Sequence, residues 1–255
     1  MKVALVTGGS GGIGYDIVFK LIKEGYYVAV TSRSLEKLRD VFKNVNTNNI
    51  HLIELDLKKF DTYPDVINSV IKRFGQLDLL VNNAGGGKLG ETINTTTLDQ
   101  WNEMMDLNLT SVYFLCQAAL KHMKYQSCII NFSSILASRP VNGLGPYSIA
   151  KAGVEMLTKS LALEVAPRNI RVLCIAPATI ETNFHTNAGM TPDAAAKYYE
   201  ASVYTHPIGR IGNSSDISQL VLFLADNEKS GFMTGSIIDV DGGRKLTSAS
   251  AGLAK

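Results

Sequence analysis

The stretch VALVTGGSGGIGYDIVFKLIKEG, residues 3–25, joins a short apolar run to a glycine-rich turn and then to a helical pattern. Ile13, Ile17 and Leu21 recur at the spacing of one helix face, and Gly25 is a typical helix stop. Glycines let a backbone approach a pyrophosphate, and a helix N-terminus offers it N–H groups and a positive dipole. The stretch therefore predicts a phosphate-binding strand–turn–helix unit, the building block of a parallel sheet.

Two glycine spacings fit this turn. Gly9, Gly11 and Gly14 match G-x-G-x-x-G, whereas Gly8, Gly12 and Gly14 match T-G-x-x-x-G-x-G. Either spacing, directly after a strand, predicts a dinucleotide-binding loop. The alternative is a plain tight turn, in which glycines are also common.

The rest of the chain continues the alternation of strands and helices. The pattern predicts strands at 28–31, 50–55, 77–81, 128–132, 170–176 and 235–240, and helices at 35–45, 63–74, 98–124, 146–165 and 217–225. Alternation without a linker predicts one α/β domain over residues 1–255, with a doubly wound parallel sheet of about seven strands and helices on both faces. Residues 181–212 follow a strand end and suit a substrate lid, with a short helix near 192–204. Residues 246–255 are expected to fray.

Composition excludes several classes of protein. The 255 residues include 45% hydrophobic and 19% charged residues, which suits a sizeable core rather than disorder. A net charge of +2, without basic clusters, argues against a nucleic-acid partner. No apolar run reaches the roughly 20 residues of a membrane span, and no signal-peptide core follows Met1. We therefore expect a cytoplasmic protein with no nucleic-acid partner and no membrane partner.

Cysteine and histidine positions give no metal-binding pattern. Cys116, Cys128 and Cys174 lie in apolar runs without paired spacing, which indicates buried free thiols in a reducing compartment. The four histidines are scattered along the chain. We therefore expect no metal.

The end of the second predicted strand, 28–31, indicates which dinucleotide is bound. NAD-binding folds place an Asp or Glu just beyond this strand, where it binds the ribose 2′-hydroxyl. Here Ser32 and Arg33 follow the strand, and a guanidinium pairs well with a 2′-phosphate. Arg33 therefore favours NADP(H), the alternative being a solvated arginine at the start of the next helix.

A second stretch, IINFSSILASRPVNGLGPYSIAK at residues 129–151, carries candidate acid–base chemistry. Ser133 and Ser134 stand at the end of a strand. Tyr147 and Lys151 are four residues apart, so a helix brings them to one face. A tyrosine with its ordinary pKa of about 10 is a poor acid–base group, but a nearby cation lowers that pKa. The pattern predicts proton transfer at an alcohol or carbonyl oxygen, the alternative being a helix with a solvated lysine.

Two other polar features need partners. Residues 82–87, NNAGGG, follow the fourth predicted strand and suit either the second wall of a cofactor cleft or an ordinary turn. Asn108 interrupts the helix predicted at 98–124 beside apolar neighbours, which indicates a kink or a polar relay.

In this order and spacing, the motifs resemble those of the short-chain dehydrogenase/reductase family, in its 3-oxoacyl-(acyl carrier protein) reductase-like branch, over nearly the whole chain. Residues 7–14 resemble the cofactor loop of the family and select the second glycine spacing. Residues 82–85 resemble its N-N-A-G turn. The resemblance implies a Rossmann-type fold and a homotetramer or homodimer, in which helices 98–124 and 146–165 form one interface.

The resemblance also implies site residues. It implies a catalytic tetrad of Asn108, Ser134, Tyr147 and Lys151. Ser134 is preferred to Ser133 because the serine of the family lies thirteen residues before its tyrosine. The implied cofactor contacts are Gly8, Ser10, Gly12, Ile13, Gly14, Ser32, Arg33, Asp56, Leu57, Asn83, Ala84, Gly85, Tyr147, Lys151, Pro177, Ala178, Thr179, Ile180 and Thr182.

The mechanism implied by the resemblance is hydride transfer between a nicotinamide and a carbonyl carbon. Tyr147 donates the proton in reduction, and Lys151 lowers its pKa and binds the nicotinamide ribose. Ser134 hydrogen-bonds the substrate oxygen, and Asn108 positions a water. Ala178 and Cys174 stand where the family often has Gly and Asn, and neither is expected to abolish activity.

We therefore predict an NADPH-dependent oxidoreductase that reduces a small-molecule ketone to a secondary alcohol, with 3-oxoacyl thioesters among the candidate substrates. Two alternatives stay open: a dehydrogenase that oxidises a sugar, polyol or hydroxysteroid, and a non-catalytic NADP-binding regulatory protein. Arg33 speaks against the first alternative, because cellular NADP is mostly kept reduced. The complete tetrad speaks against the second.

Overall fold

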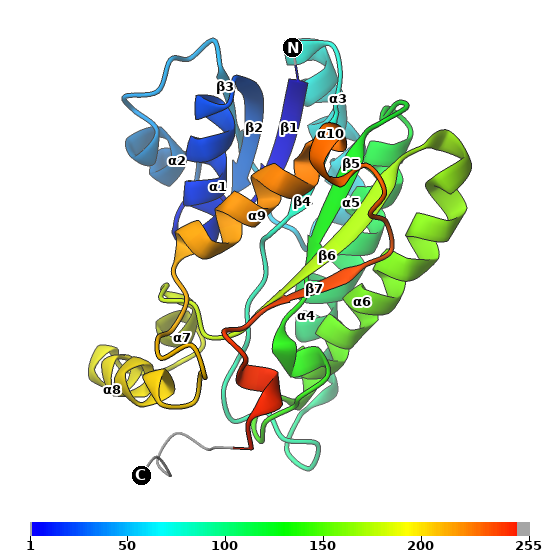
Figure 1. The fold of residues 1–255 in the computed structure, drawn as a ribbon. Helices are drawn as coiled ribbons and strands as arrows, with labels where there is room; N and C mark the ends of the chain where they lie inside the picture. Colours follow the sequence, from blue (N-terminus) through cyan, green and yellow to red (C-terminus); the bar gives the residue numbers. More distant parts are fainter. Residues whose placement is uncertain (1, 249–255) are drawn as a thin grey trace.

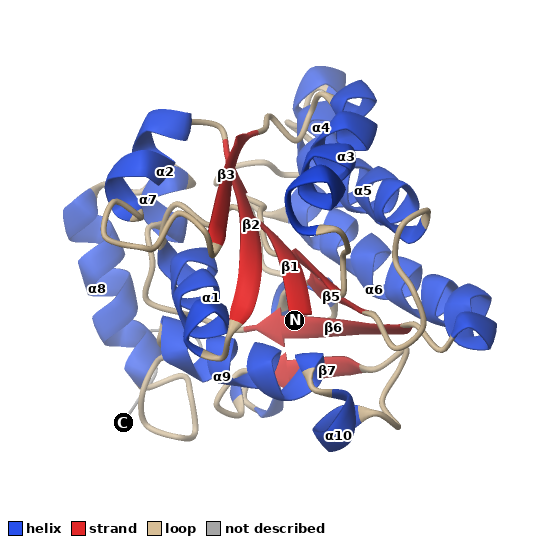
Figure 2. Cartoon of the chain, turned by 90° about the horizontal axis from the view of Figure 1, so that it is seen from above, coloured by secondary structure: helices blue, strands red, loops and turns tan. Residues whose placement is uncertain are grey.

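A single parallel sheet organises the chain (Figures 1 and 2). The computed structural model describes residues 2–248, and within them the sheet has seven strands in the order β3-β2-β1-β4-β5-β6-β7. The strands are β1 Lys2–Thr7, β2 Tyr26–Ser32, β3 Ile50–Glu54, β4 Leu79–Asn82, β5 Cys128–Phe132, β6 Arg171–Pro177 and β7 Ile237–Val240. The predicted fold class, a doubly wound Rossmann-type sheet, is confirmed.

Helices cover both faces of the sheet. They are α1 Gly12–Lys23, α2 Leu35–Val41, α3 Tyr63–Phe74, α4 Leu98–Met105, α5 Ser111–Leu120, α6 Gly145–Val165, α7 Phe184–Asn187, α8 Pro192–Val203, α9 Ser214–Ala225 and α10 Asn227–Ser230. One apolar cluster contains buried residues of α3, α5 and α6, and another contains those of α1, α2 and α9. Figure 2 shows these two helix layers on opposite sides of the strands. Strands covered on both faces are expected to be apolar throughout, and every residue of β4, β5 and β6 is buried.

Two predicted helices differ from the observed ones. The helix predicted at 35–45 ends at Val41. The long helix predicted at 98–124 is divided into α4 and α5 by a π-helical turn, Asp106–Thr110, and α5 ends at Leu120. The wider turn lies where Asn108 was predicted to interrupt the helix. Such turns are frequent at functional sites.

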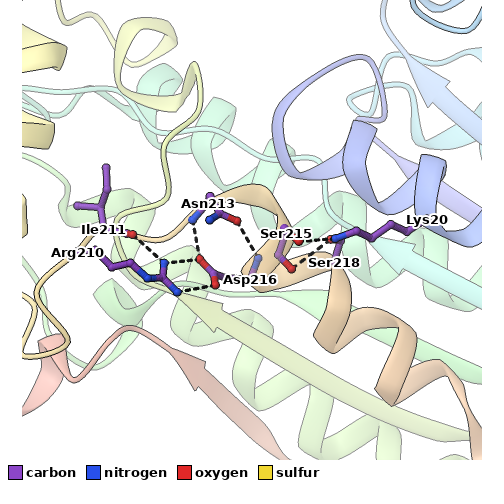
Figure 3. Close-up of polar contacts among 7 residues, drawn as sticks. All are labelled: Lys20, Arg210, Ile211, Asn213, Ser215, Asp216 and Ser218. Atoms are coloured by element: carbon purple, nitrogen blue, oxygen red, sulfur yellow. Dashed lines mark hydrogen bonds and ion pairs between the residues drawn. The ribbon is translucent and has the colours of Figure 1, made fainter.

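Polar contacts fasten α9 to α1 and to the end of the lid segment (Figure 3). Asn213 and Asp216 form a capping box, in which each side chain accepts from the backbone N–H of the other. Arg210, at the end of the lid segment, donates to Asp216 over 2.6 Å. From α1, Lys20 donates to Ser218 over 2.8 Å. The helix that starts at the glycine turn is therefore tied to the segment that follows the lid.

Three other predictions concern membrane-spanning helices, the cysteines and the C-terminal segment. Within residues 2–248 no helix combines the length and the apolar composition needed to cross a membrane. The three cysteines are free and buried. The predicted frayed segment, 246–255, falls mostly on residues 249–255, which lie outside the described part of the chain.

Candidate active site

The predicted site residues lie where the sheet order reverses. β1 is flanked by β2 on one side and by β4 on the other, so the connections after β1 and β4 leave the sheet in opposite directions. In open parallel sheets this switch point leaves a crevice outside the carboxyl ends of the strands. The glycine turn follows β1, residues 82–87 follow β4, and Ser134 follows β5, so all three reach this edge.

The glycine turn after β1 fits a pyrophosphate. Gly8 and Gly12 have φ angles of +70° and +54°, in the left-handed region that favours glycine. A Cβ on Gly14 would lie 2.3 Å from the carbonyl oxygen of Gly8. No such demand falls on Gly11, which has open space around it and an extended φ. A Cβ on Gly9 would also collide, at 2.1 Å from Val30 Cγ2, so Gly11 is the position that separates the two spacings and favours that of Gly8, Gly12 and Gly14.

The N-terminus of α1 is open to an anion. Its N-cap residue, Gly11, gives no side-chain cap, and the first turn holds no acidic residue. The first N–H groups of a helix lack partners within the helix, and they carry partial positive charge. The residues present therefore fit the pyrophosphate of a dinucleotide.

The end of β2 carries the residues predicted to meet the adenosine half. Ser32 Oγ donates to Ser10 Oγ over 3.1 Å, which joins β2 to the glycine turn. Arg33 is exposed and makes no hydrogen bond or ion pair within residues 2–248, so its guanidinium is available. After β3, Asp56 accepts the N–H of Lys58 over 3.0 Å, and Leu57 is buried.

The turn after β4 connects the glycine turn after β1 to Asn108 and Lys151, two of the predicted catalytic residues. Asn83 donates to the carbonyl of Thr7 over 2.9 Å, and the N–H of Ala84 donates to Thr7 Oγ1 over 3.0 Å. A Cβ on Gly85 would lie 2.8 Å from Asn108 Oδ1 and 3.1 Å from Lys151 Nζ. Gly85 is therefore the point at which the amide of Asn108 and the ammonium of Lys151 come together.

Asn108 is fully buried in the π-helical turn, and its amide clamps the backbone of Gly86. Its Nδ2 donates to the Gly86 carbonyl over 2.9 Å, and its Oδ1 accepts the Gly86 N–H over 3.1 Å. Its Nδ2 also donates to the Met104 carbonyl over 3.0 Å. The kink predicted from the sequence is thus paired with a polar contact that holds the second glycine turn.

Tyr147 and Lys151 lie in the first turns of α6 and point to the same region. Both are buried, with 6% and 3% of their surfaces exposed, so the alternative of a solvated lysine is wrong. Lys151 Nζ lies 5.7 Å from the centroid of the Tyr147 ring. It donates to the Phe132 carbonyl at the end of β5 over 2.8 Å. Sequence analysis missed that carbonyl, because a backbone acceptor has no signature in residue type.

Burial dominates the pKa values of this pair. It raises the pKa of Tyr147 to about 12, while the neighbouring Ser134 acts in the opposite direction. Burial also lowers the pKa of Lys151 to about 8, against a smaller raising effect of Cys174. Burial is therefore the largest influence on the Tyr147 pKa, and Ser134 is the neighbour that lowers it. The lowering effect expected of Lys151 stays a prediction. A phenol that holds its proton at neutral pH can donate it.

The two adjacent serines have different environments. Ser133 donates to the Lys151 carbonyl over 3.1 Å and to Glu155 over 2.9 Å, so it fastens β5 to α6. Ser134 accepts the N–H of Leu136 over 3.2 Å, and it lowers the pKa of Tyr147. Of the two serines, Ser134 is thus the one that acts on the pKa of the tyrosine.

The segment after β6 lies across the crevice, where Thr182 comes close to the glycine turn. Ala178, directly after Pro177, donates to the Val240 carbonyl over 3.1 Å, so the alanine continues the pairing of β6 with β7. Thr179 accepts the N–H of Gly212 over 2.9 Å. A Cβ on Gly12 would lie 3.3 Å from Thr182 Cγ2, so Thr182 faces the glycine turn. Two further predicted contacts, Ile13 and Ile180, pack into the apolar cluster of α1 and α9.

An aromatic side chain of the lid segment packs on Tyr147. The ring of Phe184 in α7 lies 5.7 Å from that of Tyr147, centroid to centroid. Tyr199 in α8 donates to the Thr182 carbonyl over 2.6 Å, which holds the lid to the segment after β6. Figure 1 shows α7 and α8 at the end of the molecule opposite to the N-terminus.

Comparisons with known proteins cover nearly the whole chain. Residues 8–245 match the family model described as enoyl-(acyl carrier protein) reductase. The chain is 36% identical to the 3-oxoacyl-[acyl-carrier-protein] reductase FabG of Staphylococcus aureus, over 95% of this chain and 97% of that protein. It is 34% identical to the 7alpha-hydroxysteroid dehydrogenase of Paraclostridium sordellii, over 96% and 92%.

Solved structures of dehydrogenases also match nearly the whole chain. A short-chain dehydrogenase/reductase of unknown function from Caenorhabditis elegans, solved with cofactor, superposes with a TM-score of 0.92 and 32% identity, over 97% of this chain and 96% of that one. The ligand-free aldohexose dehydrogenase of Thermoplasma acidophilum superposes with a TM-score of 0.86 and 31% identity, over 98% and 96%.

Proposed function

Because the chain belongs to the short-chain dehydrogenase/reductase family of oxidoreductases, we propose that it is an NADPH-dependent reductase that converts a ketone to a secondary alcohol. One observation carries the proposal. Tyr147 and Lys151 are buried together beside the carboxyl end of β5, where Lys151 donates to the Phe132 carbonyl and Ser134 lowers the pKa of the tyrosine. A nicotinamide supplies the hydride when it is bound.

The three side chains divide the remaining work. The Ser134 hydroxyl hydrogen-bonds the carbonyl oxygen of the substrate and orients it. Tyr147 gives its proton to that oxygen as negative charge develops there. With a pKa of about 8, Lys151 is mostly charged at neutral pH, and its positive charge stabilises the phenolate that is left. Asn108 holds the turn at Gly86 in place rather than touching the reacting atoms.

Turnover of a ketone panel tests this proposal. NADPH oxidation is followed with an acetoacetyl thioester, an α-diketone, a keto-sugar and a ketosteroid, and the Tyr147→Phe variant is measured in parallel. We expect at least one ketone to be reduced, and the variant to lose about 10²- to 10⁴-fold in turnover, since that is the usual contribution of a positioned acid. The best ketone names the substrate class.

A second tyrosine provides the matched control. Tyr26 is buried at the amino end of β2, away from the catalytic edge, so Tyr26→Phe is expected to keep its turnover. Folding of both variants is checked by their melting temperatures with and without NADPH. Near-full turnover by a folded Tyr147→Phe variant would show that the proton donor is misassigned.

The preference for NADPH rests on Arg33. Its exposed guanidinium follows β2, and no acidic residue stands at that position to bind a ribose 2′-hydroxyl. Loss of a hydrogen bond to a charged group typically costs about 1.5–3 kcal/mol of binding free energy. Arg33→Ala is therefore expected to raise the KM for NADPH about 10- to 100-fold and to leave the KM for NADH unchanged. Arg39→Ala, an exposed arginine of α2, is the control. An unchanged ratio of NADPH to NADH turnover in Arg33→Ala would contradict this reading.

Oxidation of an alcohol is the second candidate. Similarity to a hydroxysteroid dehydrogenase and to a solved aldohexose dehydrogenase favours it, at identities close to that of the reductase relatives. The two candidates are separated by measuring NADP⁺ reduction with a hydroxysteroid and an aldohexose beside the ketone panel. Faster oxidation than reduction for every substrate pair would favour the dehydrogenase.

We also propose that the protein is a cytoplasmic homotetramer. Its buried free cysteines suit a reducing compartment. Apolar side chains stand out from α5 and α6, where Tyr113 is 49%, Met156 60% and Leu163 80% exposed. Contiguous exposed apolar surface is typical of subunit interfaces.

A further inference from the structure

Two arginines from distant parts of the chain meet at one atom. Arg139 lies in the loop after β5, and Arg244 begins the short 3₁₀ helix Arg244–Leu246 after β7. Arg139 Nη2 and Arg244 Nη1 both donate to the carbonyl oxygen of Thr247, over 3.2 and 3.5 Å. Arg244 Nη1 also donates to Thr247 Oγ1 over 3.0 Å. Two guanidinium groups therefore share a neutral acceptor.

No carboxylate within residues 2–248 neutralises this pair. None of the ion pairs in that part of the chain includes Arg139 or Arg244. Asp241, on the same turn as Arg244, uses its two oxygens to accept the N–H groups of Gly243 and Lys245. Both guanidinium side chains are half-buried. Partly desolvated like charges are costly unless an opposite charge joins them.

The pKa of Arg244 reflects the same crowding. Burial lowers it first, and the like charge of Arg139 lowers it further, while Tyr198 acts in the opposite direction. The guanidinium keeps its charge in any case, because arginine is not deprotonated in proteins. The repulsion is therefore relieved by binding an anion rather than by losing a proton.

The arginine pair lies next to segments that carry predicted site residues. Arg139 is five residues beyond Ser134, and its N–H donates to the Ile135 carbonyl over 2.9 Å, in the short helix that Ser134 caps. Tyr198, which interacts with Arg244, lies 3.5 Å from Thr179 by its hydroxyl. In Figure 1 the segment after β7 lies at the same end of the molecule as the lid helices.

A chain of lid aromatics connects the pair to the catalytic tyrosine. The ring of Tyr198 lies 4.4 Å from that of His185, which lies 5.4 Å from that of Phe184. Phe184 in turn packs on Tyr147 at 5.7 Å. Three lid side chains, Tyr198, His185 and Phe184, therefore link Arg244 to the proposed proton donor.

We propose that Arg139 and Arg244 bind the anionic group of a ketone substrate, a carboxylate or a phosphate, at the end remote from its carbonyl. This inference rests on the proposed reductase function and narrows its substrate class. The planar forks of two guanidinium groups suit the oxygens of such a group, which replaces the Thr247 carbonyl as their shared acceptor. The alternative is that the arginines only fasten the chain at Thr247.

Binding of matched charged and neutral ligands separates these two roles. Isothermal titration calorimetry is carried out on the full chain saturated with NADP⁺. The carboxylate probes are 3-oxobutanoate, 5-oxohexanoate and 7-oxooctanoate, each compared with its methyl ester, which keeps the ketone and removes the charge. The phosphate probe is dihydroxyacetone phosphate, compared with dihydroxyacetone. We expect at least one anion to bind about 10- to 100-fold more tightly than its neutral counterpart, the range typical of a charged hydrogen-bonding partner.

Charge-removing variants then assign that preference to the arginines. Arg139→Met and Arg244→Met keep an apolar stem, and each is expected to reduce the anion preference at least tenfold while leaving affinity for the neutral ketone unchanged. Arg139→Lys keeps the positive charge and is therefore expected to retain part of the preference for anions. Arg168→Met is the matched control, because Arg168 also donates to backbone carbonyls, those of Leu120 and Met123, but far along the chain from the site.

The outcomes distinguish this inference from the proposed function. Equal binding of anions and neutral ketones, or a preference that survives in the double arginine variant, would overturn the anion site. If neutral ketones are nevertheless reduced with NADPH, the reductase proposal stands without it. Anion-selective binding without reduction of any ketone would support the arginine site and overturn the reductase.

Discussion

At the scale of single residues, the buried ammonium of Lys151 makes stability depend on pH. Its pKa falls from the ordinary value of 10.5 to about 8 because the side chain is buried. Below pH 8 the folded and the unfolded chain both carry the proton, so the folded state bears the full cost of a buried charge. Between about pH 8 and pH 10.5 the unfolded chain still carries the Lys151 proton while the folded chain has lost it. The free energy of unfolding therefore rises with pH in this range.

We therefore expect the free energy of unfolding of the wild type, relative to Lys151→Met, to rise by up to about 3 kcal/mol from about pH 7 to about pH 10.5. Urea denaturation at several pH values measures the difference. Lys159→Met, a change to an exposed lysine of the same helix, is the control and should show no such trend. A pH-independent difference for Lys151→Met would mean that burial does not shift this pKa.

At the scale of elements, the glycine turn depends on close backbone packing as well as on phosphate chemistry. A Cβ on Gly14 would collide with the Gly8 carbonyl and lie 2.6 Å from Asn83 Nδ2, whereas a Cβ on Gly11 would meet nothing within 4 Å. The same methyl group therefore has different consequences at two positions of one turn.

Gly14→Ala is expected to lower the free energy of unfolding by about 1–3 kcal/mol, the usual cost of overpacking. Gly11→Ala is expected to change it by less than about 0.5 kcal/mol. Both are measured by urea denaturation without cofactor, so that the readout is packing and not affinity. Equal stability of the two variants would show that the turn relaxes around the added carbon.

In the helical region that contains Asn108, the sequence predicts a defect but not its type. Helix formers on both sides predict one helix over 98–124, and Asn108 predicts a defect within it. The type of defect, a π-helical turn, follows from the contact of Asn108 with Gly86, which lies 22 residues earlier in the chain. Local spacing cannot contain that contact, because it depends on where β4 lies in the sheet.

At the scale of the whole molecule, the exposed side chains of α5 and α6 bear on assembly. Leu163 and Met156 are among the more exposed apolar residues, and they stand on the same helix. Charges placed there would have to be buried in an interface, which is unfavourable without partners. The double variant Met156→Glu/Leu163→Glu is therefore expected to dissociate the proposed homotetramer.

Size-exclusion chromatography with light scattering measures this change. Phe19→Glu is the control, because Phe19 is 42% exposed but stands on α1, on the other face of the sheet. A wild-type protein that elutes as a monomer, or a double variant that remains tetrameric, would contradict the proposed interface.

The sequence by itself determined what depends on short-range order. Apolar runs and helical spacing place strands and helices in alternation, which leads to the doubly wound sheet. Glycine spacing marks the phosphate turn, and the four-residue separation of Tyr147 and Lys151 puts them on one helix face. These features are encoded within a few turns of chain, so residue types and intervals suffice to find them.

Only the tertiary structure decided what depends on burial and on contacts between distant segments. Burial is the largest influence on the pKa of Tyr147. Asn108 and Lys151 both lie next to Gly85. Arg139 and Arg244 both donate to the carbonyl of Thr247, although more than 100 residues separate the two arginines. Desolvation and long-range proximity arise when the layers pack, and no interval along the chain records them.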